Sequence, residues 1–82
     1  MPDHSIPMKK LRKILRRYGI GEDMSLGKGS HTGFFKKMSL GVATYAVPTS
    51  RKSVLVCYIK ACRLRFELRE EDGVSDEEFY GE

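Results

Sequence analysis

The residues best suited to chemistry in this chain form one short stretch, Gly27-Lys28-Gly29-Ser30-His31. Its glycines allow a tight turn and a close backbone approach to a ligand, and successive N–H groups in such a turn can bind an anion. Lys28 adds a positive charge and Ser30 a hydroxyl group. The stretch lacks the Gly-x-x-x-x-Gly-Lys-[Ser/Thr] spacing of a phosphate-binding loop, so a nucleoside triphosphatase is not indicated. From these residues alone, an anion-binding turn and a plain hairpin turn are both open.

His31 is one of two histidines, and the other, His4, has no sequence neighbours that suggest a role. Because imidazole titrates near neutral pH, a histidine can take a proton from a ribose 2′-hydroxyl or give one to a leaving 5′-oxygen. RNA cleavage by internal 2′-hydroxyl attack needs such a group, cations around the phosphate and an in-line geometry, but no metal. One histidine amid lysines is the minimum set of side chains for this reaction. The alternative is an ordinary surface histidine at the start of a strand.

The sequence offers fewer suitable residues for other kinds of catalysis. No His, Cys, Asp and Glu residues stand at zinc-ligand spacing, so we expect no metal site. Residues 1–66 hold 3 acidic side chains, whereas a two-metal nuclease needs several converging carboxylates. Cys57 and Cys62 are five residues apart, which separates them on a helix or a strand, so we expect both to be reduced. A chain of 82 residues is also too short for a deep cofactor cavity, and no cofactor is expected.

Charge is divided sharply along the chain. Residues 1–66 carry 14 Lys and Arg against 3 Asp and Glu, whereas residues 67–82 carry 8 acidic residues and 1 Arg. A cationic body suits a nucleic acid, because neutralised phosphates release their counterions; a basic surface that only keeps the protein in solution is the alternative. The residues expected to contact RNA are Lys9, Lys10, Lys13, Arg16, Arg17, Lys28, Gly29, Ser30, Lys36 and Lys37.

The hydrophobic pattern predicts a helix followed by three strands. The helix starts at Pro7 and is apolar on the face that holds Met8, Leu11, Leu15 and Tyr18. Strands are expected over 20–26, 31–37 and 42–47, with a turn at 38–41. Phe34 and Phe35 should face opposite sides of the middle strand. Phe35 or Tyr45 could stack on a base, although core packing is the commoner fate of strand aromatics.

The segment over 53–68 has two periodicities. Its first residues have strand propensity, yet Leu55, Ile59, Cys62 and Phe66 share one helical face, with Ser53 as a plausible N-cap. A three-stranded sheet needs a second covering element, which favours the helix. We therefore expect an N-terminal arm over 1–6, one domain over 7–68 and a disordered acidic tail over 69–82 that could lie over the basic face. Residues 1–7 lack a signal-peptide pattern and no apolar run is long enough for a membrane span, so we expect a cytoplasmic protein that does not enter membranes.

Four motifs, taken together and in order, are similar to one family. Leu11-Arg12-Lys13-Ile14-Leu15 with Tyr18-Gly19 looks like its opening helix, and Lys28-Gly29-Ser30-His31 matches its Gly-Ser-His signature. Tyr45-Ala46-Val47-Pro48 resembles the end of its third strand, and Leu55 to Leu64, with Tyr58-Ile59-Lys60, is similar to its second helix. From Met8 to Leu64, 57 residues, the chain resembles a HicA-type mRNA interferase, the toxin of a bacterial toxin–antitoxin pair.

The resemblance implies an α+β fold of α-β-β-β-α order, with a three-stranded antiparallel sheet packed against two helices, as in a double-stranded-RNA-binding domain. It implies cleavage of mRNA by a chain that is monomeric when free, with His31 as the catalytic residue, and neutralisation by a HicB-type antitoxin. The chain departs from the family in its longer connection at 38–41, in Thr32, and in Arg63 at the usual helix-ending glycine, so we expect the last helix to run on through Phe66 or Leu68. A non-catalytic RNA- or DNA-binding module of the same fold, and a small protein adaptor, are the alternatives.

Overall fold

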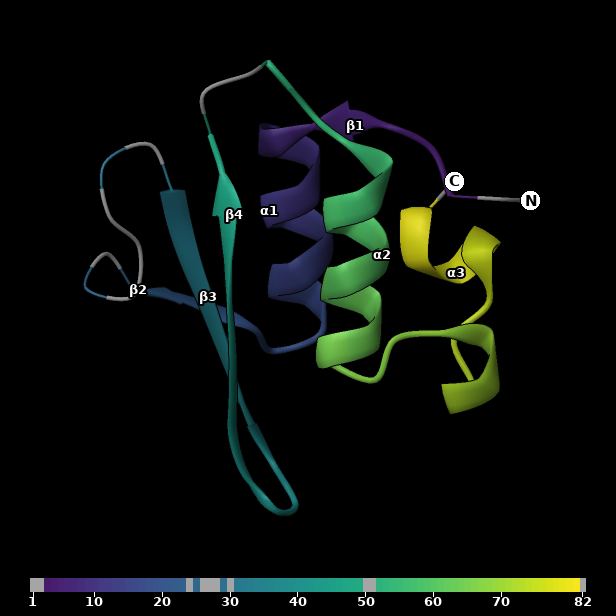
Figure 1. Cartoon of the computed structure of the whole chain (residues 1–82). Helices are drawn as coiled ribbons and strands as arrows, with labels where there is room; N and C mark the ends of the chain where they lie inside the picture. The colour runs from purple at the N-terminus through teal and green to yellow at the C-terminus, as the bar shows by residue number, and fades with distance from the viewer. Residues whose placement is uncertain (1–2, 24, 26–28, 30, 50–51, 82) are drawn as a thin grey trace.

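Two helices lie side by side between a three-stranded sheet and the C-terminal segment (Figure 1). The computed structural model describes residues 3–23, 25, 29, 31–49 and 52–81. The predicted α-β-β-β-α order is confirmed, and short elements are added at both ends and before the second helix of that order. In chain order the elements are β1 (Ile6–Pro7), α1 (Met8–Arg17), β2 (Gly21–Asp23), β3 (His31–Met38), β4 (Gly41–Pro48), β5 (Ser53–Val54), α2 (Val56–Arg65), a 3-10 turn (Glu70–Asp72) and α3 (Asp76–Tyr80).

Helix α1 forms because its apolar residues recur at helical spacing. Pro7 precedes the helix in an extended conformation. Arg16 and Arg17 lie in its last turn, where their positive charges interact favourably with the negative end of the helix dipole. Its buried residues are Met8, Leu11, Ile14 and Leu15. The lysines and arginines therefore point away from the core, as the sequence pattern predicts.

The main sheet has the antiparallel order β2-β3-β4. His31 pairs with Pro48 at one end of the β3–β4 hairpin, and Met38 pairs with Gly41 at the other end. Phe34 is buried in the core beneath the helices, so the alternation along β3 places Phe35 on the outer face of the sheet. Their predicted placement on opposite faces is confirmed. The first strand is shorter than expected.

Residues 53–68 resolve as a short strand followed by helix α2. Ser53 does not cap this helix, because it lies in β5 opposite Pro7, and Leu55 occupies the N-cap position without a side-chain cap. The expected extension through Phe66 or Leu68 is also wrong. Helix α2 ends at Arg65, and Glu67 takes the left-handed conformation (φ 56°) that turns the chain back.

The acidic segment after residue 68 is folded, which corrects the expectation of a disordered tail. A 3-10 turn and α3 bring Phe79 and Tyr80 into the core, where their exposed fractions are 0% and 4%. Ser75 caps α3 by accepting a hydrogen bond from the N–H of Glu78 (3.0 Å). The segment packs on the side of the helices opposite the sheet (Figure 1). The segment folds because Phe79 and Tyr80 bury apolar surface, although its composition is strongly acidic.

Arg63 joins the C-terminal segment to helix α2 from inside the core, with an exposed fraction of 3%. Its Nη1 donates hydrogen bonds to Oδ1 of Asp3 (2.8 Å) and of Asp76 (2.6 Å), and its guanidinium lies 4.7 Å from the centre of the Phe79 ring. Burial alone would lower the pKa of Arg63, but the hydrogen bonds to Asp76 and Asp3 outweigh it and the pKa is raised. Further hydrogen bonds from Arg63 reach the carbonyl oxygens of Leu68 and Val74.

Within the described residues, no helix is long and apolar enough to cross a bilayer.

Candidate nucleic-acid interface and active site

His31 is the first residue of β3 and its side chain is exposed. Phe34 fixes the inner face of the strand, so the side chains of His31 and Lys37 belong to the outer face, with Gly33 and Phe35 between them. Lys36 belongs to the inner face. The two neighbouring lysines predicted to bind RNA are therefore directed to opposite sides of the sheet.

The turn before His31 is described only at Gly29, and Lys28 and Ser30 lie outside the described residues. Gly29 is exposed and has a φ of 59°, a conformation that residues with a Cβ adopt at a cost. An added Cβ would meet nothing within 4 Å, so the backbone conformation alone favours glycine here. A left-handed residue is one half of the αR–αL pair in which successive N–H groups form a concave anion site, and the residues on either side of Gly29 lie outside the described part of the chain.

The basic face of α1 meets the sheet at the start of β3. Arg12 lies with Nε 3.2 Å from Oε1 of Glu22, and its Nη2 donates to Oγ1 of Thr32 (3.5 Å), the residue after His31. Arg16, one turn further on, lies 3.8 Å from the same Glu22 carboxylate. Lys9 precedes Arg12 by three residues and so lies on the same side of the helix. Sequence reasoning missed Arg12, because nothing local distinguishes it from the other cations of α1.

Arg17 lies apart from that group. Its Nη2 donates to the carbonyl oxygen of Phe79 (3.1 Å), at the end of α3. The cations predicted to bind RNA therefore divide: Arg16 lies on the sheet side of α1, whereas Arg17 supports the C-terminal segment. Lys13 is exposed, and Lys10 is half-buried.

One carboxylate also lies on the outer side of the sheet. Asp23 pairs with Gly33 across β2 and β3. Its Oδ1 accepts hydrogen bonds from the hydroxyl (2.6 Å) and the N–H (2.9 Å) of Ser25, and these bonds lower the pKa of Asp23. This anion disfavours phosphate on the β2 side of the outer face. The β4 positions of that face are Val42, Thr44, Ala46 and Pro48, which carry no charge.

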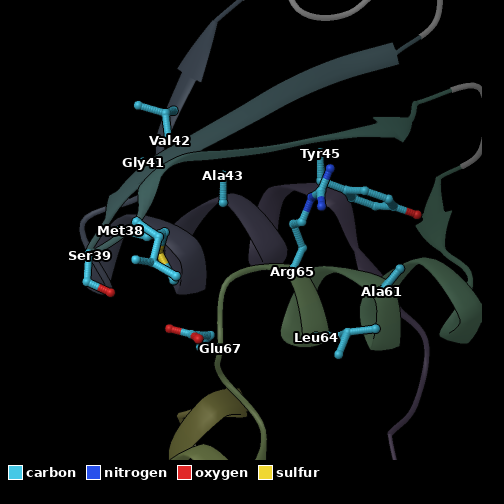
Figure 2. A pocket seen from close by; sticks show the side chains of 11 residues that line it. Met38, Ser39, Gly41, Val42, Ala43, Tyr45, Ala61, Leu64, Arg65 and Glu67 are labelled. Carbon is cyan, nitrogen blue, oxygen red and sulfur yellow. The ribbon is translucent and has the colours of Figure 1, made fainter.

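An apolar groove of about 690 Å³ lies between β4 and the end of α2 that precedes Glu67. Figure 2 shows Ala43 directed toward the helix and Val42 directed away from it, while Arg65 extends from α2 to the strand. The Nε of Arg65 donates to the carbonyl oxygen of Thr44 (2.8 Å). The groove lies at the Met38–Gly41 end of the hairpin, far along the strand from His31, and apolar side chains dominate its lining. It contributes no acid, base or nucleophile to the site at His31.

The two cysteines differ in environment. Both are free thiols, Cys57 exposed and Cys62 buried, and burial raises the pKa of Cys62 to about 12. Among the described residues, no three His, Cys, Asp or Glu side chains gather where they could hold a metal ion.

No family model, no curated protein and no solved structure matches this chain. His31, Gly29 and Arg12 lie at one end of the sheet, with Lys9 and Arg16 along the adjoining side of α1.

Proposed function

We propose that this protein binds mRNA in the cytoplasm and cleaves it by internal attack of a ribose 2′-hydroxyl, with His31 as the catalytic base. The observation that carries the proposal is the place of His31: an exposed imidazole at the start of a strand, two residues after a glycine in the left-handed conformation. An imidazole so placed is open to a polymer, and the turn before it suits a phosphate.

The chemistry needs one proton acceptor and a held phosphate. His31 takes the proton of the 2′-hydroxyl, the 2′-oxygen forms a bond to phosphorus, and the bond from phosphorus to the 5′-oxygen breaks. The leaving 5′-oxygen takes a proton from solvent, which leaves a 2′,3′-cyclic phosphate and a 5′-hydroxyl. Lys28, Gly29 and Ser30 hold the phosphate in this proposal.

The cations of α1 bind phosphates on either side of the cut. Lys9, Lys13 and Arg16 are exposed, and Arg12 reaches Thr32, the residue after the proposed base, from the inner face of the sheet. This electrostatic contribution does not depend on the RNA sequence, so it raises the affinity for RNA but does not select the cleavage position.

The test is cleavage of a labelled RNA by the purified full chain and by His31→Gln. We expect the variant to lose at least about 100-fold in rate, the usual contribution of general base catalysis. His4→Gln is the matched control, because His4 is also exposed but stacks on Tyr80 (4.3 Å between ring centres) in the N-terminal arm. Full activity in a folded His31→Gln variant contradicts the proposal.

Binding without cleavage is the second candidate, and the charge of residues 1–66 favours it, because that charge does not involve His31. A wild-type chain that binds RNA with strong salt dependence and leaves it intact would support this candidate. The sequence resemblance adds a HicB-type antitoxin as the proposed protein partner. Co-expression with a candidate antitoxin, followed by co-purification, tests that partner.

A further inference from the structure

Phe35 is an aromatic side chain on the open face of a sheet. Its exposed fraction is 37%, whereas its neighbour Phe34 is at 1% in the core. The ring lies over the backbone of β2: a Cβ added to Gly21 would come within 2.8 Å of Cζ of Phe35. Gly21 thus makes room for the ring of Phe35. One side of the ring packs on the sheet, and a substantial part of the side chain remains exposed to solvent.

Apart from Lys37, the residues that surround Phe35 on this face have small side chains or none. Gly33 precedes it by two residues on the same face and pairs with Ala46, and Thr44 lies opposite Phe35 itself. Alternate residues of a strand are about 6.6 Å apart, so His31, Gly33, Phe35 and Lys37 form one straight row. Gly33 has no side chain and its backbone is buried, so a flexible polymer on this row would contact the exposed side chains of His31, Phe35 and Lys37.

The charges on this face suit a polyanion that runs along β4. Lys37 is exposed at one end of the row and His31 at the other. Arg65 reaches the edge of β4 from the helix side of the sheet, where its Nε donates to the carbonyl oxygen of Thr44 (2.8 Å), and so adds a positive charge beside this face. Asp23 is the opposing charge among the described residues of this face, and it lies on the β2 side. Phosphates are therefore favoured on the β4 side and a base over Phe35.

We propose that the outer face of β3 and β4 is a platform for single-stranded RNA, on which Phe35 stacks a nucleobase and Lys37 binds a phosphate. The proposal rests on the proposed function, because it orients the strand so that a phosphate reaches His31. Stacking needs an exposed base face, which an unpaired nucleotide offers and a base pair inside a duplex does not. The platform therefore selects single strands, loops and unpaired ends.

The chain contains no tryptophan, so Phe35→Trp introduces one fluorophore at the proposed stacking position. The probe is an unstructured 12-nucleotide RNA with 2′-O-methyl riboses, which binds without being cut by 2′-hydroxyl attack. We expect this single strand to quench the tryptophan strongly and its duplex with a complementary strand to quench it weakly. Leu64→Trp is the matched control, since Leu64 is an exposed apolar residue of α2 that Figure 2 shows directed away from the sheet.

Affinity for the same probe completes the test. Phe35→Leu keeps an apolar side chain over Gly21 and should lose about 5- to 100-fold in affinity for the single strand, the usual range for one stacked base. Phe35→Tyr should restore it. Unchanged affinity in Phe35→Leu, or equal quenching by single strand and duplex, overturns the platform. Quenching that depends on protein concentration without RNA overturns it as well, because a second copy of the chain would then cover Phe35.

These outcomes are separate from the fate of the nuclease. If the chain cuts unmodified RNA and Phe35→Leu binds normally, the platform fails and the nuclease stands. If Phe35→Trp reports stacking and His31→Gln cuts like the wild type, the platform stands and the role of His31 fails.

Discussion

Arg63 and Asp76 form an ion pair with a 2.6 Å hydrogen bond across the seam between α2 and the C-terminal segment. The arginine side chain is 4% exposed and the aspartate side chain 15%, so the cation is more deeply buried than the anion. A buried cation that loses a partner keeps its desolvation cost, which makes such a pair sensitive to removal of either side. The pair holds the described part of the C-terminal segment against a helix whose other side faces the sheet.

Asp76→Asn should lower the free energy of unfolding by about 1–3 kcal/mol, because the hydrogen bond from the buried Arg63 loses its negatively charged acceptor while Asp3 still pairs with Arg63. Urea unfolding followed by circular dichroism measures this. Glu77→Gln is the control, since Glu77 is exposed in the same helix, and it should change stability by less than about 0.5 kcal/mol. Equal stability of the two variants would show that the ion pair between Arg63 and Asp76 does not stabilise the packing of the C-terminal segment.

The same pair predicts acid sensitivity. The hydrogen bond from Arg63 lowers the pKa of Asp76 in the folded state, below the value of about 3.9 usual for an unfolded chain. The stabilising effect is therefore complete above that unfolded value and is lost as the pH falls through the folded value. The stability difference between the wild type and Asp76→Asn should be constant from pH 7 to about 5 and should shrink toward pH 3. Stability curves that stay parallel down to pH 3 would contradict the assigned shift.

Phe79→Ala should cost about 3–5 kcal/mol, the usual range for a large aromatic residue removed from a core. Phe79 is fully buried and its ring stacks near Tyr18 (6.3 Å between centres). A domain of this size has about that much stability in total, so the variant should be largely unfolded at 37 °C. Deleting residues 72–82 removes the same side chain, so we expect loss of the fold rather than tighter RNA binding. A truncated chain with a cooperative thermal transition near that of the wild type would refute this.

The elements predicted well are those with one clear periodicity. Helix α1 separates apolar from basic residues around its circumference, and β3 places Phe34 and Phe35 on opposite faces. Helix α2 was ambiguous because its exposed positions include Leu64 and its buried ones include Arg63, so its two faces hardly differ in polarity. A local pattern cannot resolve such a helix, and its assignment depends on what it packs against.

The C-terminal segment was missed for a related reason. Its aromatic residues stand in an acidic run, and the residue that explains Asp76 lies 13 positions earlier, inside another helix. The exposure of His31 could be expected from its place at a strand start, whereas the contact between Arg12 and Thr32 depends on how α1 crosses the sheet. Contacts of this kind follow from packing and have no signature in the order of residues.

The two thiols should react at different rates. Cys62 is fully buried with its pKa raised to about 12, so little of it is thiolate at neutral pH, whereas Cys57 is exposed. A thiol reagent such as iodoacetamide should therefore modify the native chain once and the denatured chain twice, as counted by mass spectrometry. Cys57→Ser is the control, and its native form should resist modification. Rapid double modification of the native chain would show that Cys62 is accessible.

RNA cleavage should proceed in EDTA and should require the 2′-hydroxyl at the cut position. In the proposed reaction that hydroxyl is the nucleophile and His31 its proton acceptor, so replacement of one ribose by deoxyribose removes the attacking atom. Phosphate contacts are unaffected, so the substituted RNA should bind as tightly as the parent and remain intact. The products of the parent RNA should carry a 2′,3′-cyclic phosphate, which mass spectrometry distinguishes from a linear phosphate by the mass of one water. Cleavage of the deoxyribose-substituted RNA at the same position would show that water or another group attacks, and His31 would need a different role.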